Sequence, residues 1–258
     1  MLQLIPVLNL PIVQPGDDLV GLILQALQTN DISLQTNDIV VIAQKIVSKA
    51  EDCFVDLRTV TPSAQAIELA AEIDKPAAEI EVILWDTAEI IRKRKGLLIV
   101  QHKLGFISAN AGIDQSNVGP HGTHQNMVLR LPADPDMSAR TIRQGLRSGL
   151  SQKSEPAPPV LIIDSHGRAW REGTVGVTIG LSGLAPVQDL TGQPDMFGYQ
   201  LQHTQVGLTD QIAAAASLLM GQAAEACPVV VVRGLPFTLD ETAKAADVLR
   251  PKESDLFR

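Results

Sequence analysis

The chain has 258 residues, a formal net charge of −8 and a pI of about 5.1, and aromatic side chains make up 3% of it. A chain of this length can bury about three quarters of its unfolded surface, so it suits one large domain or two closely packed ones. The acidic balance and the scarcity of aromatic rings argue against a nucleic-acid-binding face, which needs a positive field and stacking rings.

The first 18 residues predict neither a signal peptide nor a membrane helix. No basic region precedes their apolar residues, and Pro6, Pro11 and Pro15 interrupt the apolar run. Cys53 and Cys227 are too few and too far apart for a disulfide framework or a metal cluster, and they indicate a reducing compartment. We therefore expect a soluble, cytoplasmic protein.

The first elements in chain order are a helix and a buried strand. Residues 17–29 carry apolar side chains at helical spacing, and residues 38–43 form a β-branched run typical of a central strand. Thr61 and Pro62 resemble a cap followed by proline at the first helical position, which predicts a helix over residues 63–73.

A further helix is expected to begin at Pro76 and to end near Gly96, because apolar residues continue at helical spacing. The cationic run 92–95 would then lie at its solvated carboxyl end, where positive charge complements the helix dipole. Strands are predicted next, at residues 97–101, 106–109 and 126–131.

The second half predicts two helices, at residues 138–150 and 208–226, and three strands, at residues 160–164, 175–181 and 228–232. Residues 151–159 have the composition of a linker, so one domain over residues 1–258 is expected to have a possible subdomain junction there. Helices and strands mix without a strict βαβ rhythm and without an internal repeat. The predicted fold class is therefore α+β, with mixed sheets and packed helices.

Familiar catalytic signatures are absent from the sequence, including the Walker-type phosphate loop, GxGxxG, HExxH, CxxC and GxSxG. His121 and His124 have a spacing that could bind a metal on a helix, but the surrounding glycines and proline favour a surface loop. Ser165 and His166 are adjacent, and adjacent side chains on an extended chain point to opposite sides, which argues against a Ser-His-Asp arrangement.

Two stretches combine carboxylates with small polar residues, SANAGIDQSNVG and IIDSHGRAWREGTVGVTIG. Asp114 and Asn117 follow an Asn-Ala-Gly turn, and Asp164 and Ser165 follow a hydrophobic run that predicts a strand. These hard oxygen ligands are the kind that Mg²⁺ or Mn²⁺ prefers. Taken together, the two stretches indicate one shared metal site.

Simpler interpretations of the same residues stay open. Asp114 could cap its own turn, Asp164 could be a helix cap or turn former, and Ser165 could be an ordinary turn residue. Lys49, on the strand-to-helix connection, could be a phosphate ligand or a solvated lysine.

The chain resembles the coenzyme F420-0:L-glutamate ligase (F420:γ-glutamyl ligase) family. The likeness runs nearly end to end and in order through LPIVQPGDDL, VVIAQKIVSKAE, ANAGIDQSNV, IIDSHGRAWREGTVGVTIGLSG, DMFGYQLQHT, IAAAASLLMGQAAE and PVVVVRGL. This resemblance implies a family-specific ligase fold with two intertwined subdomains. It also implies a GTP-dependent enzyme that joins L-glutamate to coenzyme F420-0 through an acyl phosphate.

The same resemblance implies two divalent cations (Mg²⁺ or Mn²⁺) per site, K⁺ as a monovalent cation, and a homodimer. Asp114 and Asp164 correspond to ligands of the first divalent ion, and Ser165 and Gln222 to ligands of the second. The residues that correspond to GTP contacts are Asn9, Leu10, Pro11, Ile12, Gln44, Lys49, Asn117, Met220, Gly221, Gln222, Ala223, Ala224, Glu225, Ala226 and Cys227. No residue is identified as a general base.

The chain departs from the family pattern at Gln222 and Gln211, where the family has or tends to have glutamate. Losing a carboxylate about 2 Å from a metal ion predicts a weaker second site, by at least a few kcal/mol. Residues 119–125 also look like a polar loop inserted near the first motif. Two alternatives therefore stay open, a catalytically weakened nucleotide-binding paralogue and a ligase for another carboxylate acceptor.

Overall fold

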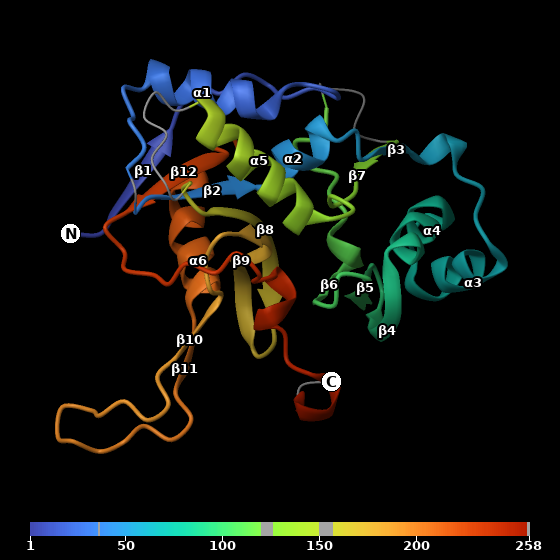
Figure 1. Ribbon diagram of the computed structural model, residues 1–258. Helices are drawn as coiled ribbons and strands as arrows, with labels where there is room; N and C mark the ends of the chain where they lie inside the picture. The colour runs from blue at the N-terminus through green and yellow to red at the C-terminus, as the bar shows by residue number, and fades with distance from the viewer. Residues whose placement is uncertain (36, 120–125, 150–156, 257–258) are drawn as a thin grey trace.

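The computed structural model describes residues 1–35, 37–119, 126–149 and 157–256. Its largest element is a five-stranded sheet (Figure 1) with the strand order β1 (Gln3–Val7), β12 (Val229–Arg233), β2 (Ile39–Ala43), β8 (Val160–Arg168) and β9 (Arg171–Ser182). β2 and β8 are parallel, and the other neighbours are antiparallel. The predicted α+β class with mixed sheets is confirmed.

Alternate residues of the central strands face two different cores. Val40 and Ile42 of β2 pack towards α1 (Leu19–Thr29) and α5 (Pro135–Gly149). The intervening residues of β2 pack towards α6 (Leu208–Met220), which covers the other face of the sheet (Figure 1). A strand buried on both faces reads as a continuous apolar run, which explains why the sequence predicted β2 correctly.

The structure confirms α1 within the predicted range 17–29, and its start follows from capping. Asp18 accepts a hydrogen bond from the backbone nitrogen of Gly21 at 3.0 Å, which satisfies one of the unpaired amides of the first turn. At the other end, Nδ2 of the Asn30 side chain donates to the carbonyls of Leu8 and Ala26, both at 2.8 Å. The bond to Leu8 connects the segment after β1 to α1.

A separate smaller core is formed by apolar residues between Ala66 and Ile113, in a unit beside the large sheet (Figure 1). It joins α3 (Ala64–Ile73) and α4 (Ala77–Trp85) to a three-stranded sheet of β4 (Thr87–Arg94), β5 (Leu97–His102) and β6 (Ile107–Ala109). The two strands predicted in this unit are confirmed. The cap of α3 is Ser63, whose hydroxyl accepts from the amide of Ala66, so the cap predicted at Thr61 and Pro62 is wrong.

The single helix predicted from Pro76 to near Gly96 is also wrong. The helix ends at Trp85, and residues 87–94 form a strand that pairs with β5. Gly96 allows the reversal because its φ is 76°, and two register shifts in β4 had obscured the strand alternation in the sequence. The cationic run 92–95 therefore lies on a hairpin, where Lys95 pairs with Asp74 at 3.0 Å.

Other predicted bounds shift by a few residues. The helix predicted over residues 138–150 begins at Pro135, and the strand predicted over residues 126–131 is β7 (Met127–Leu129). β9 begins earlier than predicted, and the strand predicted over residues 228–232 is β12. The helix predicted to run to residue 226 ends at Met220, because Gly221 leaves the helix with a φ of 68°.

Two small ribbons complete the strands, β3 (Phe54–Asp56) with β7, and β10 (Val187–Asp189) with β11 (Gln205–Gly207). The second ribbon projects away from the rest of the chain as a long arm (Figure 1). The short helices are α2 (Gln44–Ala50), η1 (Leu57–Thr59), η2 (Asn110–Gly112), η3 (Ala245–Val248) and η4 (Lys252–Ser254). None of the helices in the described ranges has the length and apolar character needed to cross a bilayer.

The predicted junction at residues 151–159 lies mostly outside the described residues, so it stays a prediction. Residues 157–159 are buried and lead directly into β8.

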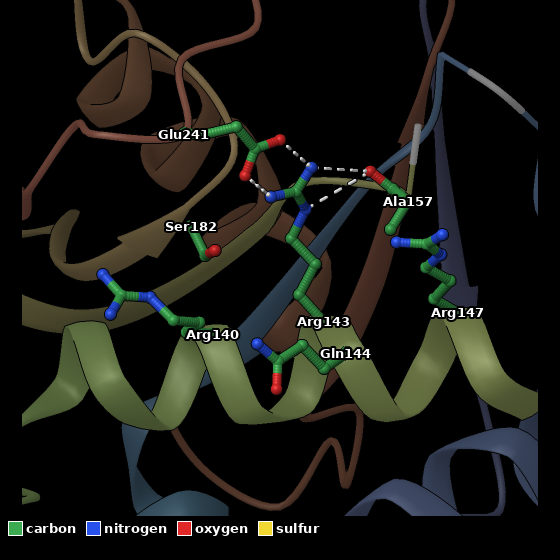
Figure 2. A pocket seen from close by; sticks show the side chains of 7 residues that line it. All are labelled: Arg140, Arg143, Gln144, Arg147, Ala157, Ser182 and Glu241. Carbon is green, nitrogen blue, oxygen red and sulfur yellow. Dashed lines mark hydrogen bonds and ion pairs between the residues drawn. The ribbon is translucent and has the colours of Figure 1, made fainter. Parts of the chain in front are cut away.

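Arg143, buried in α5, connects distant segments. Its guanidinium donates to the carboxylate of Glu241 at 2.5 and 2.8 Å and to the carbonyl of Ala157 at 3.2 and 3.3 Å. These bonds cross a pocket of about 350 Å³ (Figure 2) lined by Arg140, Arg143, Gln144, Arg147, Ala157, Ser182 and Glu241. Because its donors already bond to a carboxylate and a carbonyl, Arg143 has a structural role: it connects α5 to the start of β8 and to the C-terminal segment.

Candidate functional site

One edge of the five-stranded sheet gathers most of the predicted site segments. β1, β2 and β8 run in the same direction, so the segments that follow β1 and β2 meet the loop that precedes β12. The backbone nitrogen of Ala43 donates to the carbonyl of Pro228 at 2.9 Å, and Val7 pairs with Val229. Ala43 also pairs with Ile163, which brings Asp164 to the same edge.

Asp114 reaches this edge from the smaller unit through a left-handed turn. Asn110, Ala111 and Gly112 have φ values of 49°, 54° and 68°. The side-chain oxygen of Asn110 accepts from the backbone nitrogen of Leu98 at 3.1 Å, which fixes the turn to β5. Asp114 and Leu129 then exchange two backbone hydrogen bonds of 2.9 Å, so the position of Asp114 is set from both sides.

The carboxylate of Asp114 lies against α2. Oδ2 accepts from Nε2 of Gln44 at 2.8 Å and lies 3.3 Å from Nζ of Lys45. Burial raises the pKa of this carboxyl, the ammonium of Lys45 lowers it, and the charge of Asp164 raises it further. The raised pKa of Asp114 thus follows mainly from burial, with the charge of Asp164 a smaller contribution.

Asp164 does not end a strand, contrary to the sequence prediction. β8 continues to Arg168 because its pairing with β9 continues to the Arg168–Arg171 pair. Successive side chains of a strand point to opposite faces, so Asp164 shares a face with His166, and Ser165 points to the other. Nε2 of His166 lies 3.1 Å from Oδ2 of Asp164.

Ser165 meets the loop after α6. Its Oγ accepts from Nε2 of Gln222 at 2.9 Å, and Nδ2 of Asn117 donates to the carbonyl of Ala223 at 2.9 Å. The metal-ligand candidates thus form two pairs, Asp114 with Asp164 and Ser165 with Gln222. These are the pairs that the family resemblance implies for two ions, and ligation itself stays a prediction.

The loop from Gly221 to Cys227 is exposed up to its buried end and turns back on itself. The carboxylate of Glu225 accepts from the backbone nitrogen of Ala223 at 2.8 Å. The pKa of Glu225 is lowered by backbone hydrogen bonds, with Ala223 the largest contributor. These backbone amides therefore already hold a carboxylate of the same loop, which stabilises its turn.

The remaining candidates surround this edge. Residues 9–12 follow β1, and Ile12 is 80% exposed. β12 lies between β1 and β2, so β1 is about 10 Å from β2. Gln44 is buried, and its amide is occupied by Asp114 and by the hydroxyl of Ser48. Lys49 is half-buried, and burial and then the charge of Lys45 lower its pKa, while Asp114 raises it.

Sequence reasoning grouped Lys45 with Lys49 as cations beside the candidate site but did not identify its contact with Asp114, and it assigned no role to His166. Lys45 precedes Lys49 by four residues, which places both ammonium groups on one face of α2. His166 follows Asp164 by two residues, so the alternation of a strand could have linked them. His121 and His124 lie outside the described residues.

The residue chemistry suits divalent cations. Asp114, Asp164, Ser165 and the amide oxygen of Gln222 are hard oxygen donors of the kind that Mg²⁺ and Mn²⁺ prefer. The amide of Gln222 presents its nitrogen to Ser165, and a half-turn about its last bond would present the oxygen instead. Within the described residues, no three His, Cys, Asp or Glu side chains form a metal cluster by themselves.

The chain is similar over most of its length to proteins of one family. A model of the family described as F420-0:Gamma-glutamyl ligase matches residues 7–234. The coenzyme F420:L-glutamate ligase of Methanothermobacter thermautotrophicus is 40% identical over 258 residues, which cover 100% of this chain and 99% of that protein. The proteins of the same name from Methanocaldococcus jannaschii and Archaeoglobus fulgidus are 38% and 35% identical, over 85% and 99% of this chain and 84% and 96% of their own. The chain therefore belongs to the F420-0:gamma-glutamyl ligase family.

Proposed function

We propose that this protein forms an amide bond between the amino group of L-glutamate and a carboxylate of coenzyme F420-0, with GTP as the co-substrate. The observation that supports it most is the full-length similarity to proteins named coenzyme F420:L-glutamate ligase. The gathering of carboxylates, lysines and an amide-rich loop at one edge of the sheet supplies the chemical groups that such a reaction needs.

In the proposed reaction, a carboxylate oxygen of F420-0 attacks the γ-phosphorus of GTP, and GDP leaves with the electron pair of the broken bond. The amine of glutamate then attacks the resulting acyl phosphate, loses a proton and expels inorganic phosphate. Catalysis of phosphoryl transfer depends on positioning and on compensation of negative charge. No side chain is assigned as the base that takes the proton of the amine.

The chain's own residues would hold the phosphates in this reaction. Lys45 and Lys49 lie on one face of α2 and would bring two positive charges to the phosphates. Asp114 and Asp164 would hold one divalent ion, and Ser165 and Gln222 a second. Divalent ions bound by these residues would neutralise the negative charge of the phosphates.

We also propose a homodimer that forms through the β10–β11 arm. The end of this arm exposes Met196, Phe197 and Tyr199, with exposed fractions of 95%, 93% and 61%. Large apolar side chains gathered on a projecting ribbon mark a protein-protein contact, because burying them in a second copy releases their hydration.

Gln222 favours one alternative, a catalytically weakened nucleotide-binding paralogue. Its amide donates to Ser165 and adds no negative charge to the second pair. A third candidate keeps the same chemistry with another carboxylate acceptor.

Purified protein incubated with GTP, Mn²⁺, K⁺, L-glutamate and F420-0 separates these candidates. The proposed function predicts glutamylated F420-0 and one GDP for each amide bond. GTP binding without product would favour the weakened paralogue, and GTP turnover only with another acid would favour a different acceptor. Replacement of GTP by ATP in a parallel reaction tests the choice of nucleotide.

A further inference from the structure

His166 lies inside the candidate site but has no assigned role. His166 is 8% exposed, and its Nε2 lies 3.1 Å from Oδ2 of Asp164. An ionised carboxylate only accepts hydrogen bonds, so in this contact the proton belongs to Nε2 of the imidazole. Within the described residues, this is the one hydrogen bond to the side chain of Asp164 that the structure contains.

Aromatic packing fixes the ring of His166. Its centroid is 5.0 Å from that of Phe106, with an angle of 51° between the planes. Phe106 stacks in turn on His102, at 4.9 Å and 15°. Nδ1 of His102 accepts from the backbone nitrogen of Leu104 at 3.0 Å, which anchors this aromatic column to the end of β5.

The aromatic column therefore joins the smaller unit to β8 at the level of Asp164. Asp114 reaches the site from the same smaller unit, through the turn after β6. The smaller unit thus contacts the site in two places, through Asp114 itself and through the aromatic column that packs on His166.

We propose that His166 is the positioning residue for Asp164. The Nε2–H group holds Oδ2 in place, so the other carboxylate oxygen stays available to bind a cation together with Asp114. Histidine and carboxylate partners outside the ligand set commonly orient metal ligands in this way, and their loss lowers metal affinity by about 10-fold to 100-fold. This inference rests on the proposed function, because it assigns Asp164 to a divalent ion.

Two substitutions separate the hydrogen bond from the packing. His166→Phe keeps an aromatic ring against Phe106 but removes the donor, whereas His166→Gln places an amide donor near the position of Nε2. His102→Phe is the matched control, because His102 belongs to the same aromatic column and does not bond to Asp164. Mn²⁺ affinity is measured by calorimetry on each full-length protein without substrates, and kcat and KM are measured separately.

We expect His166→Phe to weaken Mn²⁺ binding by about tenfold or more and to lower kcat. His166→Gln should restore most of both, and His102→Phe should lower the melting temperature without changing Mn²⁺ affinity. Equal affinity in wild type and His166→Phe would overturn the inference, as would a His166→Gln protein as defective as His166→Phe. Absence of Mn²⁺ binding in the wild type would overturn both the inference and the metal assignment of the proposed function.

Discussion

The contact between Lys45 and Asp114 predicts that removing the charge of Lys45 lowers the stability of the protein but strengthens its metal binding. Nζ of Lys45 lies 3.3 Å from Oδ2 of Asp114, and their side chains are 23% and 27% exposed. At an effective dielectric constant of about 20, the attraction is about 5 kcal/mol. Desolvation offsets much of it, so we expect Lys45→Met to lower the free energy of unfolding of the metal-free protein by about 1–3 kcal/mol.

The pH dependence of this loss follows from the pKa of Asp114. Lys45 lowers that pKa, which burial and Asp164 raise, so the substitution raises it further. The stabilisation that Lys45 supplies is present where Asp114 is ionised and disappears as the pH falls through its folded pKa, because a neutral carboxyl no longer attracts the ammonium. Urea unfolding of both proteins between neutral and acidic pH measures this difference.

Metal binding should change in the other direction. Lys45 places a positive charge where a divalent ion would approach Asp114, so its removal should tighten Mn²⁺ binding by about tenfold, which corresponds to about 1.4 kcal/mol. Calorimetry on the same Lys45→Met protein measures this affinity.

Lys95→Met is the matched control, because Lys95 pairs with Asp74 at 3.0 Å while the two side chains are 83% and 73% exposed. Exposed pairs contribute little, so its unfolding and metal affinity should match the wild type. Weaker Mn²⁺ binding in Lys45→Met, or a stability loss that persists at acidic pH, would refute this reasoning.

Three further outcomes are expected. Gln222→Glu should tighten Mn²⁺ binding because it adds a carboxylate beside Ser165, and unchanged or weaker affinity by calorimetry would count against Gln222 as a ligand. Phe197→Ser combined with Met196→Ser should shift the protein from dimer to monomer in light scattering, and a monomeric wild type would contradict the role of the arm. Arg143→Met should lower the free energy of unfolding by about 2–3 kcal/mol, because it leaves the buried carbonyl of Ala157 without its donor. If urea unfolding shows that Arg143→Met changes the free energy of unfolding by less than about 0.5 kcal/mol, the structural role of Arg143 is excluded.

Elements with one dominant local pattern could be predicted from the sequence. The continuous apolar run of β2 and the capped, periodic helix α1 agree with their structures because packing and local preference point the same way. The strand β4 could not be predicted in this way. Its two register shifts break the alternation, and only pairing with β5 makes it a strand.

The candidate site, too, could be predicted from the sequence only in part. Asp114 and Asp164 stood out from the sequence because each lies in a motif with glycine and polar neighbours. The contacts of Asp114 with Gln44 and Lys45 could not be predicted, since these residues lie about 70 positions earlier in the chain and meet Asp114 only in the folded protein. The opposite orientation of Asp164 and Ser165 could not be predicted either, because it depends on the pairing with β9 that continues β8 past them.

In the proposed reaction, the protein joins a carboxylate of F420-0 to glutamate and converts GTP to GDP and phosphate. The most direct measurement uses F420-0 labelled with ¹⁸O in that carboxylate, with GTP, Mn²⁺, K⁺ and L-glutamate, and mass spectrometry of both products. We predict glutamylated F420-0 together with inorganic phosphate that carries one ¹⁸O atom for each amide formed. Unlabelled phosphate, or GTP hydrolysis without glutamylated product, would contradict the claim.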